Sequence, residues 1–205
     1  MLSRFMQILS SPHIFSNLVL SFTSLFIFSR YFRAQPFISK WLWGIFLFFI
    51  ALVALTDLLV YAGVESLENF HEIVIAGEMT LGAFCLVSAS WCLIMRYKAG
   101  TYFFVSTIGL GLLLMYCITW FGVEYVGLII KSLAILITLL ISCVGLASRQ
   151  KSALWVIFSM MLLALSTKSG KLPIPMDPVD INHYMMVLSV ICVGRAARDQ
   201  YKILF

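Results

Sequence analysis

Carboxylates and histidines occur inside apolar segments of this chain, at spacings that put them on shared helix faces. Asp57 and Tyr61 are four residues apart, and Asp180 and His183 are three apart, so each pair lies on one face of a helix. An ionisable side chain in hydrocarbon costs ~2.5–3.5 kcal/mol, and it persists where it faces a partner, water or a functional site. We therefore treat these residues as candidates for metal binding or proton transfer.

Four further ionisable residues extend this set. His71 and Glu78 are seven residues apart and share one stripe of the apolar segment 71–96, while Glu72 lies on the adjacent face. Lys131 lies about seven residues into the apolar segment 124–147. Two interpretations of Glu78 and Lys131 follow: they form a structural ion pair, or they belong to the same functional pocket as the histidines.

The composition indicates which elements position these residues. The chain has 205 residues, of which 62% are hydrophobic and 11% charged, and its mean hydropathy is +1.02. Soluble proteins carry ~25% charged residues, so a water-soluble enzyme, a disordered chain and a secreted disulfide scaffold are excluded. Basic loops beside anionic lipid headgroups account for the net charge of +5. We expect membrane lipids as partners and no nucleic acid.

Apolar runs separated by short polar breaks predict an all-α, polytopic membrane protein. A spanning helix needs ~20 apolar residues, and no alternating strand pattern competes with the helical interpretation. A cleaved signal peptide is the alternative for residues 1–30, but a small-x-small cleavage site is missing there, so we expect a retained helix. We predict one domain, 1–205, with transmembrane helices at 12–30, 41–63, 71–96, 101–121, 124–147, 152–168 and 180–198.

Lysine and arginine residues are distributed unequally between the two ends of these helices. Arg4, Lys168 and Lys171 lie on one side and Lys131 lies within a helix, whereas ten of the 14 basic residues lie on the other side: Arg30, Arg33, Lys40, Arg96, Lys98, Arg149, Lys151, Arg195, Arg198 and Lys202. The excess marks the cytoplasmic side. The N-terminus is then outside and the C-terminus inside, in a cytoplasmic or equivalent membrane. The candidate residues lie near outer helix ends, which predicts a pocket that opens outward.

The remaining chemistry-bearing residues have simpler interpretations. The five cysteines are scattered without a CxxC pair, which indicates packing residues. Trp41 and Trp43 lie near a predicted inner helix end, as interfacial anchors do. We interpret His13 as a lone interfacial histidine. A retinal-binding protein is excluded because the helix at 180–198 contains no lysine.

Two segments carry a resemblance to a known family. Segment 51–63 reads ALVALTDLLVYAG, and the last helix contains Asp180-Ile-Asn-His183, then eleven residues, then Arg195-Ala-Ala. Together with seven spans and an outside N-terminus, this resembles the alkaline-ceramidase-like membrane hydrolase superfamily, which includes progestin/adiponectin-receptor-type and Per1-like proteins. The resemblance implies a zinc site held by three histidines, and hydrolysis of a lipid amide.

The residues that match the family pattern differ from it in type. Asp57 lies where the family has a serine, Tyr61 where it has the first zinc histidine, and Glu72 where it has an aspartate. His183 matches the second histidine of the last helix, and Val179 occupies the place of the first. The resemblance therefore implies a metal set of His183, Asp57 and Glu72, with Asp180 or His71 as helper and Asp57 and Glu72 as catalytic groups. An oxygen-rich set of this kind need not prefer zinc over another divalent metal.

Two functions are compatible with these features. The first is a divergent metal-dependent hydrolase acting on a lipid-like amide or ester in an outward-facing pocket that also contains Tyr61, His71, Glu78, Asp180 and Lys131. The alternative is a non-enzymatic protein that has lost the metal site and serves in binding, assembly, or ion- or proton-coupled transport.

Overall fold

A computed structural model describes residues 11–32, 35–171, 173 and 175–202. This part of the chain is helical and contains no strand, which confirms the all-α class. The two arginines Arg4 and Arg33, which enter the predicted charge asymmetry, lie outside the described residues. The helices are α2 (Pro12–Tyr31), α3 (Phe37–Tyr61), α4 (Glu68–Gly77), α5 (Ala83–Ile94), α6 (Thr101–Phe121), α7 (Glu124–Ala147), α8 (Lys151–Ser166) and α9 (Pro178–Lys202).

Short helices complete the chain path. A π-helical turn, η2 (Glu78–Gly82), joins α4 to α5, so these elements form one continuous helical segment. The 3₁₀ turns η1 (Glu65–Leu67) and η3 (Ser169–Lys171) precede α4 and follow α8. Observed helix ends differ from the predicted ones by up to four residues, as at the start of α3, where the chain becomes helical at Phe37.

Five helical segments of the described chain are long and apolar enough to cross a membrane: Pro12–Tyr31, Phe37–Tyr61, Glu68–Ile94, Thr101–Phe121 and Tyr125–Ala147. Helix α8 is apolar but shorter. The described helices therefore establish five segments that could span a membrane, and the total of seven crossings stays a prediction.

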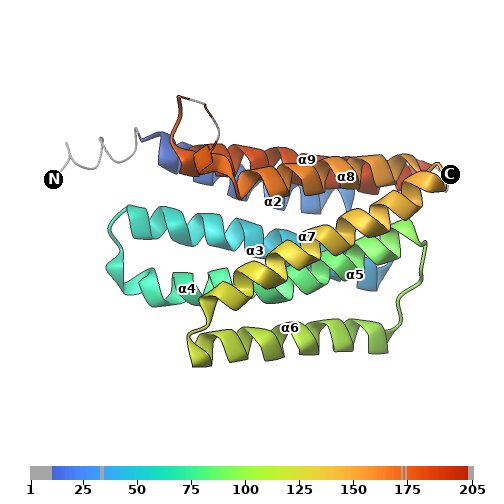
Figure 1. Ribbon diagram of the computed structural model, residues 1–205, viewed down its shortest axis with the longest axis horizontal. Helices are drawn as coiled ribbons and strands as arrows, with labels where there is room; N and C mark the ends of the chain where they lie inside the picture. The colour runs from blue at the N-terminus through green and yellow to red at the C-terminus, as the bar shows by residue number, and fades with distance from the viewer. Residues whose placement is uncertain (1–10, 33–34, 172, 174, 203–205) are drawn as a thin grey trace.

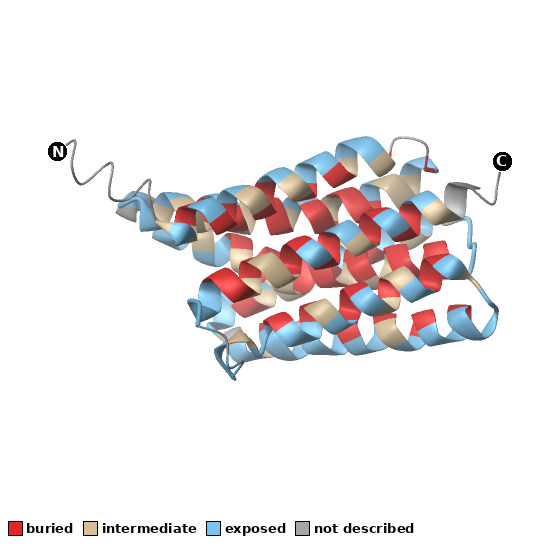
Figure 2. Ribbon diagram, turned by 90° about the horizontal axis from the view of Figure 1, so that it is seen from above, coloured by how far each residue is buried: buried red, intermediate tan, exposed pale blue. Residues whose placement is uncertain are grey.

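The helices lie side by side along the long axis of the molecule (Figure 1). Helix α2 packs between α3 and α9, α9 packs on α8, and α7 connects α8 to α5. Helix α6 lies at the margin: 17% of its most apolar stretch is buried, compared with 67% for Glu68–Ile94. Buried residues line the faces that helices turn toward one another, and exposed residues cover the outside (Figure 2).

Local signals explain where several helices begin and end. Ser11 caps α2 by accepting a hydrogen bond from the Ile14 amide at 3.4 Å, and Pro12 occupies the first turn, where its missing N–H has no cost. Helix α9 begins at Pro178, and the Asp177 carboxylate accepts from the Val179 amide at 2.8 Å. Gly122 ends α6 at a φ of 63°, which permits the very short turn into α7.

The core of the bundle contains an aromatic residue that the sequence interpretation placed at the membrane interface. Trp43 is completely buried, with its ring centroid 5.6 Å from that of Phe32 and 6.2 Å from that of Phe46. Trp41, two residues earlier, is 47% exposed. Two residues apart on a helix point in different directions, so only Trp41 is on the outer surface and the prediction for Trp43 was wrong.

Candidate functional site

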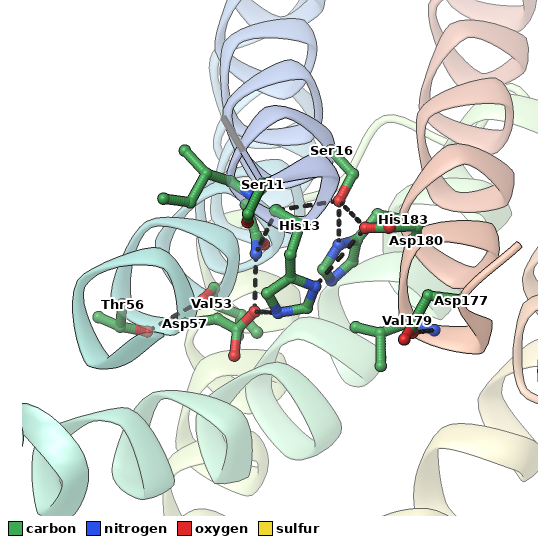
Figure 3. Close-up of polar contacts among 12 residues, drawn as sticks. Ser11, His13, Ser16, Val53, Thr56, Asp57, Asp177, Val179, Asp180 and His183 are labelled. Carbon is green, nitrogen blue, oxygen red and sulfur yellow. Dashed lines mark hydrogen bonds and ion pairs between the residues drawn. The ribbon is translucent and has the colours of Figure 1, made fainter. Parts of the chain in front are cut away.

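Polar side chains from α2, α3 and α9 meet at the end of the bundle where α2 and α9 begin and α3 ends (Figure 3). The caps at Ser11 and Asp177 set the first turns of α2 and α9, and these turns carry most of the site. We call the following residues the polar cluster: His13, Ser16, Asn17, Asp57, Asp180 and His183.

His13 lies at the centre of the polar cluster and faces a carboxylate with each ring nitrogen. Its Nε2 is 3.3 Å from Asp57 Oδ2, and its Nδ1 is 3.5 Å from Asp180 Oδ1. Both distances exceed the roughly 2.7–3.2 Å of an ordinary N–H···O hydrogen bond. The His13 ring also lies 4.8 Å from the Tyr61 ring and 5.6 Å from the His183 ring, centroid to centroid. His13 therefore joins α3 to α9.

Ser16 connects the two functional residues of α9. Its hydroxyl lies 2.6 Å from Asp180 Oδ1 and 3.1 Å from the His13 carbonyl, which both accept, and 3.0 Å from His183 Nδ1. Because the hydroxyl has one proton and its shortest contact is to an acceptor, the contact with the imidazole has His183 Nδ1–H as the donor. This tautomer leaves His183 Nε2 with a free lone pair, which can bind a metal ion or accept a proton.

Asn17 orients Asp57 from the same helix as His13. The Asn17 amide nitrogen donates to Asp57 Oδ2 at 2.7 Å and also to the His13 carbonyl at 3.2 Å. Asn17 is completely buried, yet its Oδ1 has no hydrogen-bond partner among the described residues. An unsatisfied buried carbonyl costs ~1–3 kcal/mol, so this oxygen is a free acceptor beside the carboxylate.

His71, at the start of α4, completes the surroundings of Asp57. Its Nδ1 is 2.7 Å from Thr56 Oγ1, and the Thr56 hydroxyl is within 3.0 Å of the Leu52 carbonyl in its own helix. The contact with His71 is the shortest one of the Thr56 hydroxyl, and a hydroxyl that donates to Nδ1 leaves the imidazole proton on Nε2. His71 Nε2–H then faces the acceptor Asp57 Oδ1 across 3.9 Å.

The charge of the polar cluster is unbalanced. Asp180 is 4% exposed, and the Asp57 side chain is 29% exposed. Among the residues that the structure describes, neither carboxylate pairs with a lysine or arginine. The amino-terminal end of α9 stabilises Asp180 by ~0.3–1 kcal/mol, which is small beside the cost of a buried charge. Two carboxylates without a lysine or arginine partner among the described residues suit a divalent cation.

The ligand atoms of three residues are close enough to share such an ion. One ligand atom each from His13, Asp180 and His183 can be chosen so that all lie within 4.8 Å of one another. Zinc–ligand bonds of ~2.0–2.2 Å put tetrahedral ligand atoms ~3.3–3.6 Å apart. Side-chain movements of about 1 Å would therefore bring the three ligand atoms to the spacing that a bound ion requires. Two imidazoles and one carboxylate are a donor set that fits a divalent metal.

Of the predicted metal set, the structure brings together Asp57 and His183, both of which contact His13. Glu72 is exposed and lines a different groove, with Met79 on η2, Ile118 on α6 and Leu128 on α7. A helix turns by about 100° per residue, so Glu72 and His71 point in different directions. Among the described residues, no contact joins Glu72 to the polar cluster.

Glu78 and Lys131 form an ion pair, as the first of the two interpretations of these residues predicted. Lys131 Nζ donates to Glu78 Oε1 at 2.8 Å and to Oε2 at 3.1 Å. Glu78 is 8% exposed, and it begins the π-helical turn η2 that packs on α6 and α7. The pair links η2 to α7, whereas the polar cluster belongs to α2, α3 and α9.

The sequence interpretation missed three residues of the polar cluster. His13, Ser16 and Asn17 are spaced i, i+3 and i+4, which puts all three on one face of an otherwise apolar helix. That stripe was the available signal. His13 was instead interpreted by itself, and the two small polar residues were not assigned a role.

The fold and the site together define a class: an all-helical protein with apolar helices of membrane-spanning length and a cluster of histidines and carboxylates at one end of the bundle. The chain belongs to a family of unknown function (DUF6962), whose model matches residues 13–202. The match includes every residue of the polar cluster. No curated protein and no solved structure matches the chain.

Proposed function

We propose that this protein is a membrane-embedded hydrolase that uses a divalent metal ion, zinc or another, to cleave an amide or ester of a lipid-like amphiphile. The observation that carries the proposal is that the imidazoles of His13 and His183 and the carboxylate of Asp180 lie close together, with the Asp57 carboxylate beside His13. Among the described contacts of these residues there is no lysine or arginine. The superfamily resemblance noted above supports the same chemistry. It carries less weight, because the metal residues proposed here differ from those that the resemblance implied.

We further propose that seven helical segments cross the membrane, with the N-terminus outside. These segments are α2, α3, the continuous segment from α4 to α5, α6, α7, α8 and α9. The basic residues support this arrangement: those at the ends of α5 and α7 and at the start of α8 lie at the end of the bundle opposite to the polar cluster (Figure 1). Cytoplasmic loops are rich in lysine and arginine. The polar cluster would then lie just inside the outer membrane surface.

Each residue of the polar cluster has a defined role in this proposal. His13, Asp180 and His183 would hold the ion, and Ser16 would fix the tautomer of His183 through its 3.0 Å contact. A divalent ion would supply Lewis acidity at a carbonyl group and would lower the pKa of nearby water. Asp57 would be the general base, since its side chain is 29% exposed and its Oδ1 faces His71 across 3.9 Å, so protons can leave toward the outer surface.

The surroundings of the polar cluster favour an amphiphilic substrate. Phe15 on α2, Leu59 on α3 and Val179 on α9 flank the site in sequence and are 61%, 40% and 42% exposed. Such side chains contact acyl chains when the helices lie in a bilayer. A lipid with its tail in the hydrocarbon would present an amide or ester near the headgroup level, which is where the polar cluster would lie.

Metal analysis of the purified protein tests the proposal directly. We expect one divalent ion per chain in the wild-type protein, and a decrease in affinity of more than about 100-fold for His13→Ala, which loses a ligand. His71→Ala is the matched control, because His71 faces Asp57 and not the proposed ion. Absence of a bound divalent metal in the wild-type protein, together with wild-type behaviour of His13→Ala, would overturn the proposal.

Activity measurements then separate metal binding from acid–base chemistry. Asp57→Asn should keep the metal and lose about 10²–10⁴-fold in kcat on a lipid amide or ester, which is the usual contribution of a general base. Equal loss of metal and activity in Asp57→Asn would instead make Asp57 a ligand. This result would contradict the assignment of Asp57 as the base.

One observation favours a second candidate function. The two nitrogens of His13 each face a carboxylate, as both N–H groups of a charged imidazolium would. The polar cluster would then be a proton site in a non-enzymatic, proton-coupled protein. Proton uptake into protein-containing liposomes that is lost in Asp57→Asn, in a preparation free of divalent metal, would favour this function over hydrolysis.

A further inference from the structure

A second site lies at the opposite end of the molecule, where α2 and α9 end (Figure 1). A cleft of about 580 Å³ there is lined by Phe26, Ser29, Arg30, Tyr31 and Arg198. We call it the arginine cleft. We propose that the arginine cleft binds the phosphate group of an anionic membrane phospholipid.

The close packing of α2 on α9 puts the two arginines on the same cleft. Gly194 of α9 lies directly against α2: a methyl group at that position would be 2.8 Å from Ile27 Cγ2 and 3.2 Å from Tyr31 Cδ2. Arg198 is four residues after Gly194, one turn further along the same face. Arg30 is next to Tyr31 on α2. The two arginine side chains therefore line the cleft from different helices.

The arginine cleft carries two positive charges that acids of the described chain do not neutralise. Both arginines are exposed, and among the described residues neither forms an ion pair with a carboxylate. The neighbouring acid in the sequence, Asp199, accepts a hydrogen bond from Trp155 Nε1 at 2.9 Å. Two open guanidinium groups lining one cleft favour an anion, and a guanidinium matches the oxygens of a phosphate with two parallel donors.

The apolar side of the arginine cleft favours a lipid over a soluble phosphate compound. Phe26 lines the cleft and is 45% exposed, and its ring stacks on that of Phe22, which is 72% exposed, at a centroid distance of 6.1 Å. These rings extend the surface from the arginines along α2 toward the middle of the helix. A phosphate at the arginines would leave an acyl chain on the phenylalanines. Basic pockets between helices at the cytoplasmic side bind anionic headgroups in this way.

Retention of lipid by the detergent-purified full-length protein, measured by native mass spectrometry, tests the site. We expect the wild-type protein to retain phosphatidylglycerol in preference to phosphatidylcholine. The double variant Arg30→Gln/Arg198→Gln should bind phosphatidylglycerol about 30-fold more weakly, from ~1 kcal/mol for each basic residue. The variant Arg30→Lys/Arg198→Lys keeps the charge without the paired donors and should be intermediate.

A matched control removes the same charge elsewhere at this end of the bundle. Lys98 and Lys151 are exposed and lie outside the arginine cleft, so Lys98→Gln/Lys151→Gln should retain lipid within about 3-fold of wild type. Equal losses in the two double variants would show general charge attraction and overturn the proposal. Displacement of the lipid by millimolar inorganic phosphate at constant ionic strength, with the same dependence on the arginines, would also overturn it in favour of a soluble phosphate ligand.

Discussion

A single hydroxyl group, that of Ser16, connects the carboxylate of Asp180 to the imidazole of His183. Ser16→Ala removes the 2.6 Å and 3.0 Å contacts together and leaves both partners without this bond. Hydrogen bonds to charged groups contribute ~1.5–3 kcal/mol, so we expect a loss of that size in the free energy of unfolding in detergent. We also expect metal affinity to fall by about 10–100-fold, because His183 loses the group that fixes its tautomer.

Ser24 provides the matched control on the same helix. It is completely buried like Ser16, but its hydroxyl donates only to the Leu20 carbonyl of its own helix, at 2.9 Å. Ser24→Ala should therefore change stability by less than about 1 kcal/mol and leave metal affinity unchanged. Equal effects of the two substitutions on metal affinity would contradict the role of Ser16 in the polar cluster.

At the residue scale, the sequence indicates which charged side chains need a partner, because such residues are conspicuous in apolar segments. It indicates less reliably which residue that partner is. The Glu78–Lys131 pair could be proposed because each residue is a lone charge in an apolar segment of the sequence. Asp57 was recognised as a candidate for the same reason, and Asp180 because it shares a helix face with His183. Their common neighbour His13 was not, because a histidine in the first turn of a helix has an ordinary interfacial role, and only the packing of α2 between α3 and α9 brings it to both carboxylates.

At the scale of the elements, the π-helical turn η2 is held by close contact with α6. Gly111 of α6 lies against this turn: a methyl group on Gly111 would be 2.8 Å from the Leu81 Cα atom, so the backbone itself would have to move. We expect Gly111→Ala to destabilise the protein by about 1–3 kcal/mol through overpacking, measured by thermal unfolding in detergent.

Gly109 is the matched control for this packing. It lies two residues earlier on the same helix, and a methyl group there would meet nothing within 4 Å. Gly109→Ala should be neutral or stabilise the helix by up to about 1 kcal/mol, since alanine has the higher helix propensity. A destabilisation by Gly109→Ala equal to that of Gly111→Ala would show that the effect does not come from the contact with Leu81.

Hydrophobic runs predicted where helices lie, and they could not predict how the segment after Gly77 is wound. The π-helical turn Glu78–Gly82 contacts Gly111 and Lys131, which are distant in the sequence, and hydrophobic runs contain no signal for such contacts. Helix starts were less accurate than helix existence because local caps and prolines set them. Helix α3 begins directly after Pro36, four residues before the start that its apolar run predicted.

At the scale of the whole molecule, the two ends of the bundle have opposite character. The polar cluster, with Asp57 and Asp180, lies at the end where α2 begins, and the arginine cleft lies at the end where α2 finishes. The sequence predicted this separation because successive helices run in opposite directions, so that the connecting segments alternate between the two ends of the bundle. The charged residues of each connecting segment can then be assigned to one end. It could not predict which helices are neighbours, since apolar helix faces of similar composition pack on one another in many arrangements.

The separation of the two ends gives a direct test of whether the bundle crosses a membrane. The turn after α8 and the connection between α5 and α6 lie at opposite ends of the bundle (Figure 1). The first contains Gly170 and the second contains Lys98. A side chain at Gly170 would meet nothing within 4 Å, and Lys98 is exposed, so cysteine fits at either position.

A membrane-impermeant maleimide should label Gly170→Cys in intact cells and Lys98→Cys only after permeabilisation, because the basic end faces the cytoplasm. The wild-type protein is the control for background labelling of its own five cysteines, of which Cys143 is exposed. Labelling of both variants from the same side would contradict a bundle that spans the bilayer, and labelling with the sides exchanged would invert the proposed orientation and place the polar cluster at the cytoplasmic surface.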